Sequence, residues 1–135
     1  MDAIELMHIL GRDFRCVFHK SELELAILYF INMIKDERVI LIYEDKKPHA
    51  ILTYSLTDDT ETFLKKKTWD YLPQNLLSKT IYIEKLVSKG WNKELRTIFE
   101  QMILKRHPLL EHGVWHRYGL WGDRRVLTKR RLQNV

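Results

Sequence analysis

Residues 34–57 read IKDERVILIYEDKKPHAILTYSLT, and the pattern of this stretch decides the expected fold. The apolar, β-branched run at 39–43 predicts a strand, the charged residues 44–47 predict a turn, and residues 48–56 resume extended character. Pro48 is compatible with this interpretation because proline, which lacks an N–H donor, is tolerated where a strand starts. The stretch therefore predicts a β-hairpin.

A helix is expected just before the hairpin. Ser21 and Glu24 have the spacing of a capping box, in which two side chains satisfy free N–H groups at a helix start. Apolar residues then recur at helical intervals and cover nearly the whole circumference, so we expect this helix to be buried. They are Leu23, Leu25, Ala26, Ile27, Leu28, Tyr29, Phe30, Ile31, Met33 and Ile34.

Downstream of the hairpin, helix and strand signals alternate. The sequence Thr-Asp-Asp at 57–59 suits the first turn of a short helix toward Leu64, and residues 65–79 are expected to form a loop. The run 81–87 predicts a third strand, after which Gly90 turns the chain and Asn92 caps a helix through Leu104. In that helix Leu95, Ile98, Phe99 and Met102 form an apolar stripe opposite Lys93, Glu94, Arg96 and Glu100.

The C-terminal part predicts two short strands around a turn at 121–123. His107 and Pro108 end the preceding helix, and the final basic residues are expected outside the sheet or at its edge. His112 and His116 have the i, i+4 spacing of a helical metal site, but Gly113 and the aromatic pattern favour a strand, so no metal site is expected. The full order α, α, β, β, α, β, α, β, β predicts an α+β fold with an antiparallel-rich mixed sheet flanked by helices.

Composition bounds the protein class. A chain of 135 residues with 45% apolar and 30% charged residues is typical of one globular domain, so we expect a single domain over 1–135 with a basic C-terminal segment at 124–135. No stretch approaches the ~20 apolar residues of a membrane-spanning helix. Cys16 is the single cysteine, which excludes an intramolecular disulfide and favours a cytoplasmic protein.

The stretch 34–57 resembles the signature of the lysine acyltransferases that activate RTX toxins. In that family a buried helix leads to an apolar strand, a turn, a Pro-x-Ala strand, a tryptophan, and then Leu-Ser and acids that open a helix. Pro48 and Ala50 are in register with this pattern, while Tyr54 occupies the tryptophan position and Thr57 the serine position. The resemblance implies an acetyltransferase-like fold.

Later motifs extend the likeness from about His19 to Met102. Trp69, the strand at 81–87 and Gly90 resemble the family's tryptophan, apolar strand and helix-opening glycine. The resemblance implies transfer of a fatty acyl group from acyl carrier protein, or from acyl-CoA, to a protein lysine. It also implies a catalytic histidine before the buried helix and an aspartate on the later strand, whose positions here are held by His19 and Glu84.

These two residue types suit the chemistry. Histidine, with an ordinary pKa of about 6.5, can act as a base near neutral pH. A carboxylate can orient the imidazole and stabilise its cation. No tightly bound cofactor is expected. The turn before the helix that follows Asn92 contains one glycine rather than a glycine-rich loop, so acetyl-CoA is not favoured as donor. The expected donor-binding residues are Lys89, Gly90 and Asn92.

A basic and aromatic surface is expected near the C-terminus. Its residues would bind an acidic donor such as acyl carrier protein, another protein, or single-stranded nucleic acid through ring stacking and phosphate contacts. The alternative is that the aromatic residues pack in the sheet while the arginines face water. The residues are Trp115, Arg117, Arg124, Arg125 and Arg130.

Two functions therefore remain open. The first is an acyltransferase with His19 as base, Glu84 as its partner and a protein lysine as substrate. The second is a catalytically inactive relative of the same scaffold, used by a phage or mobile element to bind a host protein or nucleic acid through its basic surface. A homodimer is compatible with either function.

Overall fold

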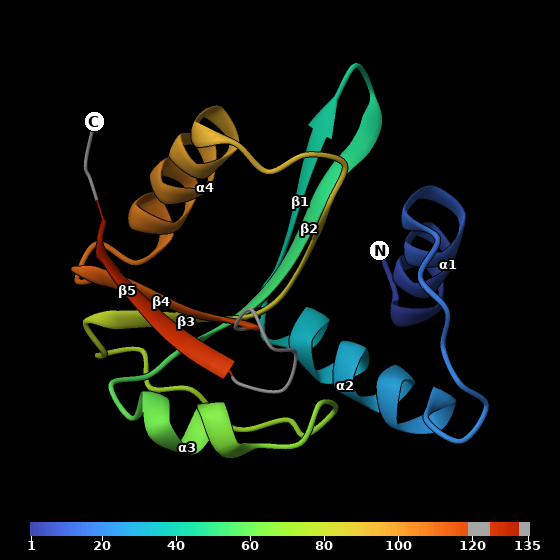
Figure 1. Ribbon diagram of the computed structural model, residues 1–135, viewed down its shortest axis with the longest axis horizontal. Coiled ribbons are helices and arrows are strands. Elements are labelled where there is room, and N and C mark those ends of the chain that lie inside the picture. Colours follow the sequence, from blue (N-terminus) through green and yellow to red (C-terminus); the bar gives the residue numbers. More distant parts are fainter. Residues whose placement is uncertain (119–124, 133–135) are drawn as a thin grey trace. The chain divides into compact units, whose positions relative to one another are not determined.

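The computed structural model describes the backbone of residues 1–118 and 125–132 and the side chains of residues 1–115 and 129–132. The elements follow in the order predicted from the sequence (Figure 1). They are α1 (Ala3–Phe14), α2 (Leu23–Lys35), β1 (Val39–Glu44), β2 (Lys47–Leu56), α3 (Thr60–Lys65), β3 (Thr80–Ser88), α4 (Lys93–Arg106), β4 (His112–Tyr118) and β5 (Arg125–Arg131).

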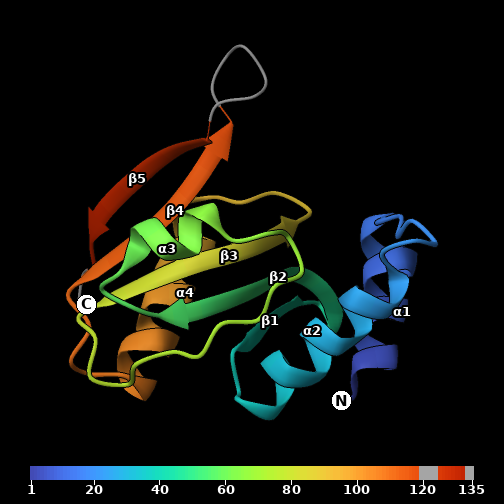
Figure 2. The same ribbon diagram turned by 90° about the horizontal axis from the view of Figure 1, so that it is seen from below.

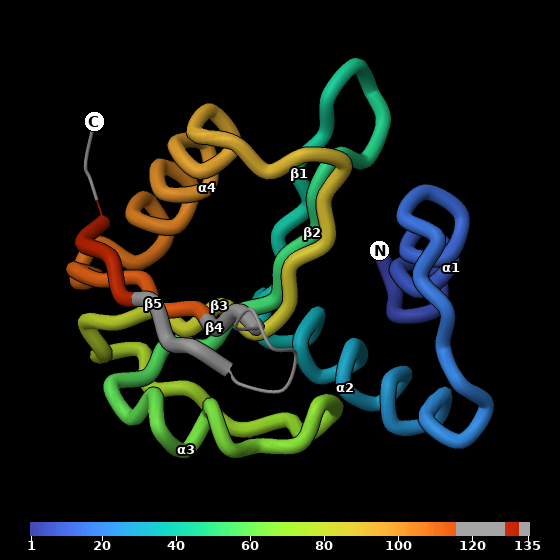
Figure 3. Tube along the Cα trace, in the orientation of Figure 1, coloured from blue at the N-terminus to red at the C-terminus, as the bar shows by residue number. Residues whose placement is uncertain are grey.

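The strands form a mixed sheet in the order β1-β2-β3-β4-β5. β1 pairs antiparallel with β2, β3 pairs parallel with β4, and β4 pairs antiparallel with β5. The chain leaves β3, forms α4 and returns as β4, and this path can be followed along the Cα trace in Figure 3. β5 lies beside β4 at the end of the strand order (Figure 2), so the predicted position of the basic residues 129–131 at a sheet edge is confirmed.

The hairpin predicted from residues 39–56 is confirmed. Asp45 and Lys46 form its turn with positive φ angles of 52° and 64°, the left-handed conformation that a tight two-residue hairpin turn requires. The pairing register shifts between Ile42 and Tyr43, where Pro48 faces Tyr43. The proline thus lies at an irregularity near the strand start, where its missing N–H is tolerated.

Residue contacts divide the chain into two compact units. The first comprises Met1–Thr53, Lys66–Leu72 and Lys85–Gly90, and the second comprises Tyr54–Lys65, Pro73–Glu84 and the described residues from Trp91 onward. No described helix combines the length and the apolar character that a membrane span requires. A single domain over residues 1–135 stays a prediction.

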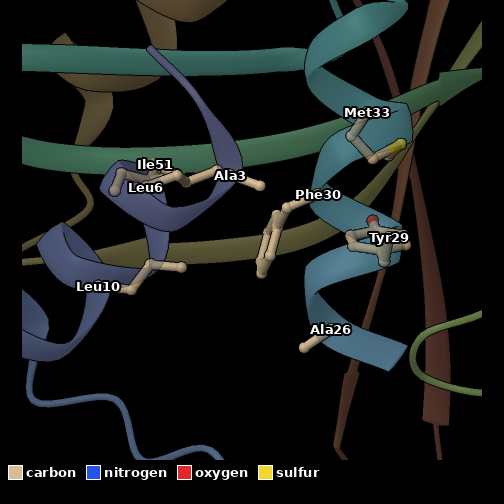
Figure 4. Packing of buried hydrophobic residues seen from close by; sticks show 8 residues of the cluster. All are labelled: Ala3, Leu6, Leu10, Ala26, Tyr29, Phe30, Met33 and Ile51. Atoms are coloured by element: carbon tan, nitrogen blue, oxygen red, sulfur yellow. The ribbon is translucent and has the colours of Figure 1, made fainter. Parts of the chain in front are cut away.

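The core of the first unit lies between α1 and α2 (Figure 4). Ala3, Leu6 and Leu10 of α1 pack with Ala26, Tyr29, Phe30 and Met33 of α2 and with Ile51 of β2. α1 begins at a capped turn, because the Asp2 side chain accepts a hydrogen bond of 2.8 Å from the Glu5 N–H.

Two predictions about α2 are wrong. Its N-cap is Glu22, with no side-chain cap, because the Glu22 N–H bonds the His19 carbonyl in a turn and displaces Ser21 from the capping position. The helix is also not buried all round: Leu25, Leu28 and Ile31 are 55%, 52% and 46% exposed. An apolar pattern on every side cannot indicate which side a neighbouring element will cover.

The second unit contains two capped helices. The Asp59 carboxylate accepts bonds from the Thr62 N–H and hydroxyl at the start of α3, and these bonds lower the Asp59 pKa. The Asn92 side chain accepts a 2.9 Å bond from the Leu95 N–H at the start of α4, which confirms the predicted cap. His107 follows the last residue of α4, so the predicted end of the helix is confirmed as well.

The apolar stripe of α4 differs from the prediction at two positions. Leu95, Phe99 and Ile103 are buried, but Ile98 is 43% exposed. Glu100, expected on the solvent side, is buried instead. Its carboxylate lies 3.0 Å from the guanidinium of Arg130 in β5, and this partner allows an acid to occupy a buried position.

Candidate functional site

Glu84 is held on β3 by a hydrogen bond from a neighbouring strand. The buried Ser55 hydroxyl on β2 donates to Glu84 Oε2, and the Glu84 side chain is half-buried. The parallel pairing of β3 with β4 runs from Thr80 opposite His112 to Ile83 opposite Trp115. Glu84 therefore follows directly after the paired stretch, in the second unit.

A second pair of polar residues in this unit was not found from the sequence. The Tyr54 hydroxyl lies 3.4 Å from His107 Nε2, and the two rings meet edge to face. Burial, and to a lesser degree the positive charge of Arg106, lowers the pKa of His107. This environment therefore favours the neutral imidazole over the imidazolium. The sequence indicated His107 only as a helix end.

His19 lies in the first unit, in the turn that leads into α2. Its side chain is exposed, and its carbonyl accepts the Glu22 N–H at 2.9 Å. The predicted partner of His19, Glu84, belongs to the second unit. Cys16, three residues earlier, is half-buried; burial raises the pKa of its thiol, which lowers the thiolate fraction that a nucleophile needs.

Lys89 and Gly90, predicted to bind the donor, lie beside a carboxylate–histidine pair that the sequence did not reveal. Glu44 Oε2 lies 2.9 Å from His49 Nδ1, and His49 Nε2 lies 3.4 Å from the Gly90 carbonyl. The Lys89 N–H donates to the His49 carbonyl at 2.9 Å, while the Lys89 side chain is exposed. Gly90 has a φ of 149°, a conformation that favours glycine.

Asn92, the third predicted donor-binding residue, uses its side-chain oxygen to cap α4. Its contribution to a donor site would therefore be to fix the start of the helix. A helix N-terminus presents free N–H groups and a partial positive charge, which suit a phosphate.

The C-terminal basic residues differ in availability. Trp115 is half-buried in β4, and Arg130 is ion-paired with Glu100 without the alignment of a hydrogen bond. Lys129 and Arg131, the neighbours of Arg130 in β5, are exposed, as the alternation of side chains along a strand requires. The sequence indicated this cluster but not which of its charges reach solvent.

Three residues of the predicted basic surface fall partly or wholly outside the description. Arg117 and Arg125 lie on the paired backbones of β4 and β5, but their side chains are outside the described residues. Arg124 lies outside the described residues altogether. The predicted roles of these three arginines stay predictions.

Trp69, which the sequence indicated only through the family pattern, lies at the centre of an aromatic cluster in the first unit. Its ring packs against Phe18, Tyr29 and Phe30 at centroid distances of 5.7 to 5.9 Å. The Lys85 ammonium lies 4.4 Å from the Trp69 ring centroid, close enough for a cation–π interaction. These contacts hold the segment 66–72 against α2.

Within the described residues, no group of three or more His, Cys, Asp or Glu side chains could hold a metal ion. Comparison of the sequence with protein-family models and with curated proteins finds no match.

Proposed function

We propose that the protein transfers an acyl group from acyl carrier protein, or from acyl-CoA, to a protein lysine on an acetyltransferase-like scaffold. The main support is the position of Glu84 directly after the paired stretch of the parallel strands β3 and β4, which are joined through α4. Ligands of open α/β folds bind toward the carboxyl ends of parallel strands, and Glu84 lies on that side of the paired stretch. A half-buried carboxylate that is held in place by Ser55 is suited to orienting a base or stabilising a cation there.

The reaction needs one proton acceptor and one stabilised charge. The lysine amine attacks the thioester carbonyl, a C–N bond forms, the C–S bond breaks, and the thiolate leaves and takes up a proton. A base removes the proton that the attacking nitrogen loses, and His19 is the proposed base. Glu84 is proposed to orient or stabilise the cationic group that results.

The donor site is proposed at the turn that contains Lys89 and Gly90 and at the start of α4 after Asn92. The exposed Lys89 ammonium and the N–H groups of the first helical turn suit the phosphate of a phosphopantetheine arm. Lys129 and Arg131 on the edge strand β5 are exposed and suit the acidic surface of a carrier protein.

The test is transfer of a labelled acyl group, offered separately on acyl carrier protein and on coenzyme A, to proteins of a cell lysate. His19→Ala and Glu84→Gln are compared with His8→Ala and Glu61→Gln, which change exposed residues of the same types on α1 and α3. We expect loss of about 10²- to 10⁴-fold for the first two variants, the usual range for a general base, and little change for the controls.

Two further histidine variants make this test sharper. If His49→Ala or His107→Gln abolishes transfer while His19→Ala leaves it unchanged, the base has been assigned wrongly, because both of these imidazoles have a described polar partner. Absence of transfer from both donors by folded protein contradicts the acyltransferase proposal as a whole.

The second proposed function is a catalytically inactive protein of a phage or mobile element that binds a host protein or nucleic acid. It is favoured by the exposed cations of the edge strand, Lys129 and Arg131. Reversing both charges should abolish such binding, whereas Arg12→Glu on α1, which changes an exposed arginine outside this surface, should not. Transfer activity that depends on Glu84 would contradict this function.

A further inference from the structure

The outer face of α2 carries an uncovered apolar stripe. Leu25, Leu28 and Ile31 are each about half exposed, and their spacing of three residues places them along one side of the helix. The opposite side of α2 is buried in the core with α1 (Figure 4). Contiguous exposed apolar residues mark interaction surfaces more often than scattered ones do.

Two charged residues lie on the same side of the helix, one at each end of the stripe. At 100° per residue, Glu24 and Lys35 fall within 40° of the direction of Leu28. Both side chains are exposed, and neither has an ion-pair partner in the part of the chain that the structure describes. On this side of the helix, the stripe therefore begins at one acidic side chain and ends at one basic side chain.

We propose that this stripe, Glu24 to Lys35 of α2, binds the same stripe of a second copy of the chain in an antiparallel, two-fold symmetric pair. In such a pair Leu28 meets its own counterpart, and Leu25 of one copy faces Ile31 of the other. Glu24 then lies three residues, about 4.5 Å along the axis, from the position opposite Lys35 of the second copy. The lysine side chain spans that offset, so two ion pairs flank the apolar centre.

The charges select this occupant and this direction. A parallel pair would place Glu24 beside Glu24 and Lys35 beside Lys35, and like charges at an interface are unfavourable. A membrane surface would require a basic border, but the exposed residues that flank α2 include Glu22, Asp36 and Glu37 beside Lys20. The same acids disfavour an acidic carrier protein on this face.

The pair is expected to be weak. A standard protein interface buries about 800 Å² per partner, and a single stripe of three half-exposed side chains offers less. We therefore expect a dissociation constant on the order of 10 μM or weaker. Sedimentation equilibrium of the full chain between about 1 μM and 1 mM covers this range.

The deciding experiment is a charge exchange across the pair. Glu24→Lys alone should weaken dimerisation at least tenfold because it places two lysines together, and Lys35→Glu alone should do the same. The double variant Glu24→Lys/Lys35→Glu restores opposite charges and should restore dimerisation to within about threefold of wild type. Circular dichroism checks that α2 still forms in each variant.

An apolar substitution provides the second test. Leu28→Ser should make the chain monomeric, whereas Ile98→Ser, which changes a similarly exposed apolar residue on α4, should leave dimerisation unchanged. A wild-type chain that is monomeric at 1 mM overturns the proposal, as does a dimer that persists in folded Leu28→Ser. Failure of the double charge exchange to restore the dimer overturns the antiparallel arrangement.

Discussion

The hydrogen bond between Tyr29 and Thr53 offers a quantitative test of the packing in the first unit. The two oxygen atoms are 2.8 Å apart, and each residue is 1% exposed, so the bond joins α2 to β2 away from water. Tyr29→Phe keeps the ring but removes its hydroxyl, and the Thr53 hydroxyl loses this partner. We expect the free energy of unfolding to fall by about 1–3 kcal/mol, the cost of a buried polar group that loses a hydrogen bond.

A double-mutant cycle separates this bond from the loss of packing. Valine has nearly the same shape as threonine, and Thr53→Val should also lower the free energy of unfolding by about 1–3 kcal/mol. Because removing both partners leaves fewer unsatisfied groups, Tyr29→Phe/Thr53→Val should be destabilised by about 1 kcal/mol less than the sum of the single variants. Urea denaturation measures all four proteins. If the two single effects add to within about 0.3 kcal/mol, the bond does not couple α2 to β2 and the reasoning is refuted.

Three further predictions concern the second unit. Asn92→Ala should lower the free energy of unfolding by about 1 kcal/mol because the Leu95 N–H loses its cap. Asn92→Asp keeps a side-chain oxygen that can accept this bond and should retain most of the stability. Chemical denaturation measures both variants, and equal losses would contradict the capping role. Arg130→Ala should destabilise the chain by about 3 kcal/mol because the buried Glu100 carboxylate loses the Arg130 cation. Arg131→Ala, at an exposed position, should change stability by less than about 0.5 kcal/mol in the same assay. Burial lowers the pKa of His107 below its ordinary 6.5, so the unfolded chain binds a proton at His107 more tightly than the folded chain does. The stability contribution of the neutral imidazole is complete above pH 6.5 and is lost as the pH falls from 6.5 toward the folded pKa. His107→Gln should remove this pH dependence of the free energy of unfolding in denaturation curves at several pH values, and an unchanged dependence would contradict the prediction.

The order of helices and strands could be predicted because each element has a local signal. The β-branched run at 39–43 and the residues after Pro48 specify a hairpin, and Asn92 specifies the start of α4. Such signals depend on backbone preferences and on side chains within about four residues. They were wrong where two local solutions compete: the turn at His19 and Glu22 displaced the capping box expected at Ser21.

The candidate site could be predicted only in part. His19 and Glu84 were predicted from the resemblance, and Lys89 and Gly90 from the turn before α4; their roles stay predictions. The bond from Ser55 to Glu84 is a contact that the sequence did not indicate. The pairs Glu44–His49 and Tyr54–His107 were missed, the second because its members lie 53 positions apart along the chain. No spacing rule connects residues that a sheet and a helix bring together.

The sequence by itself determined which segments become helices and strands, the mixed character of the fold and the presence of basic residues at its last strand, because these follow from short-range periodicity and composition. Only the tertiary structure decided which side of each element is covered. It buried Glu100 against Arg130, left Lys129 and Arg131 in solvent, and exposed Leu25, Leu28 and Ile31 on a helix whose pattern predicted full burial. The reason is physical: burial depends on how many elements pack around a segment, and that number is set by long-range contacts that a local pattern does not contain.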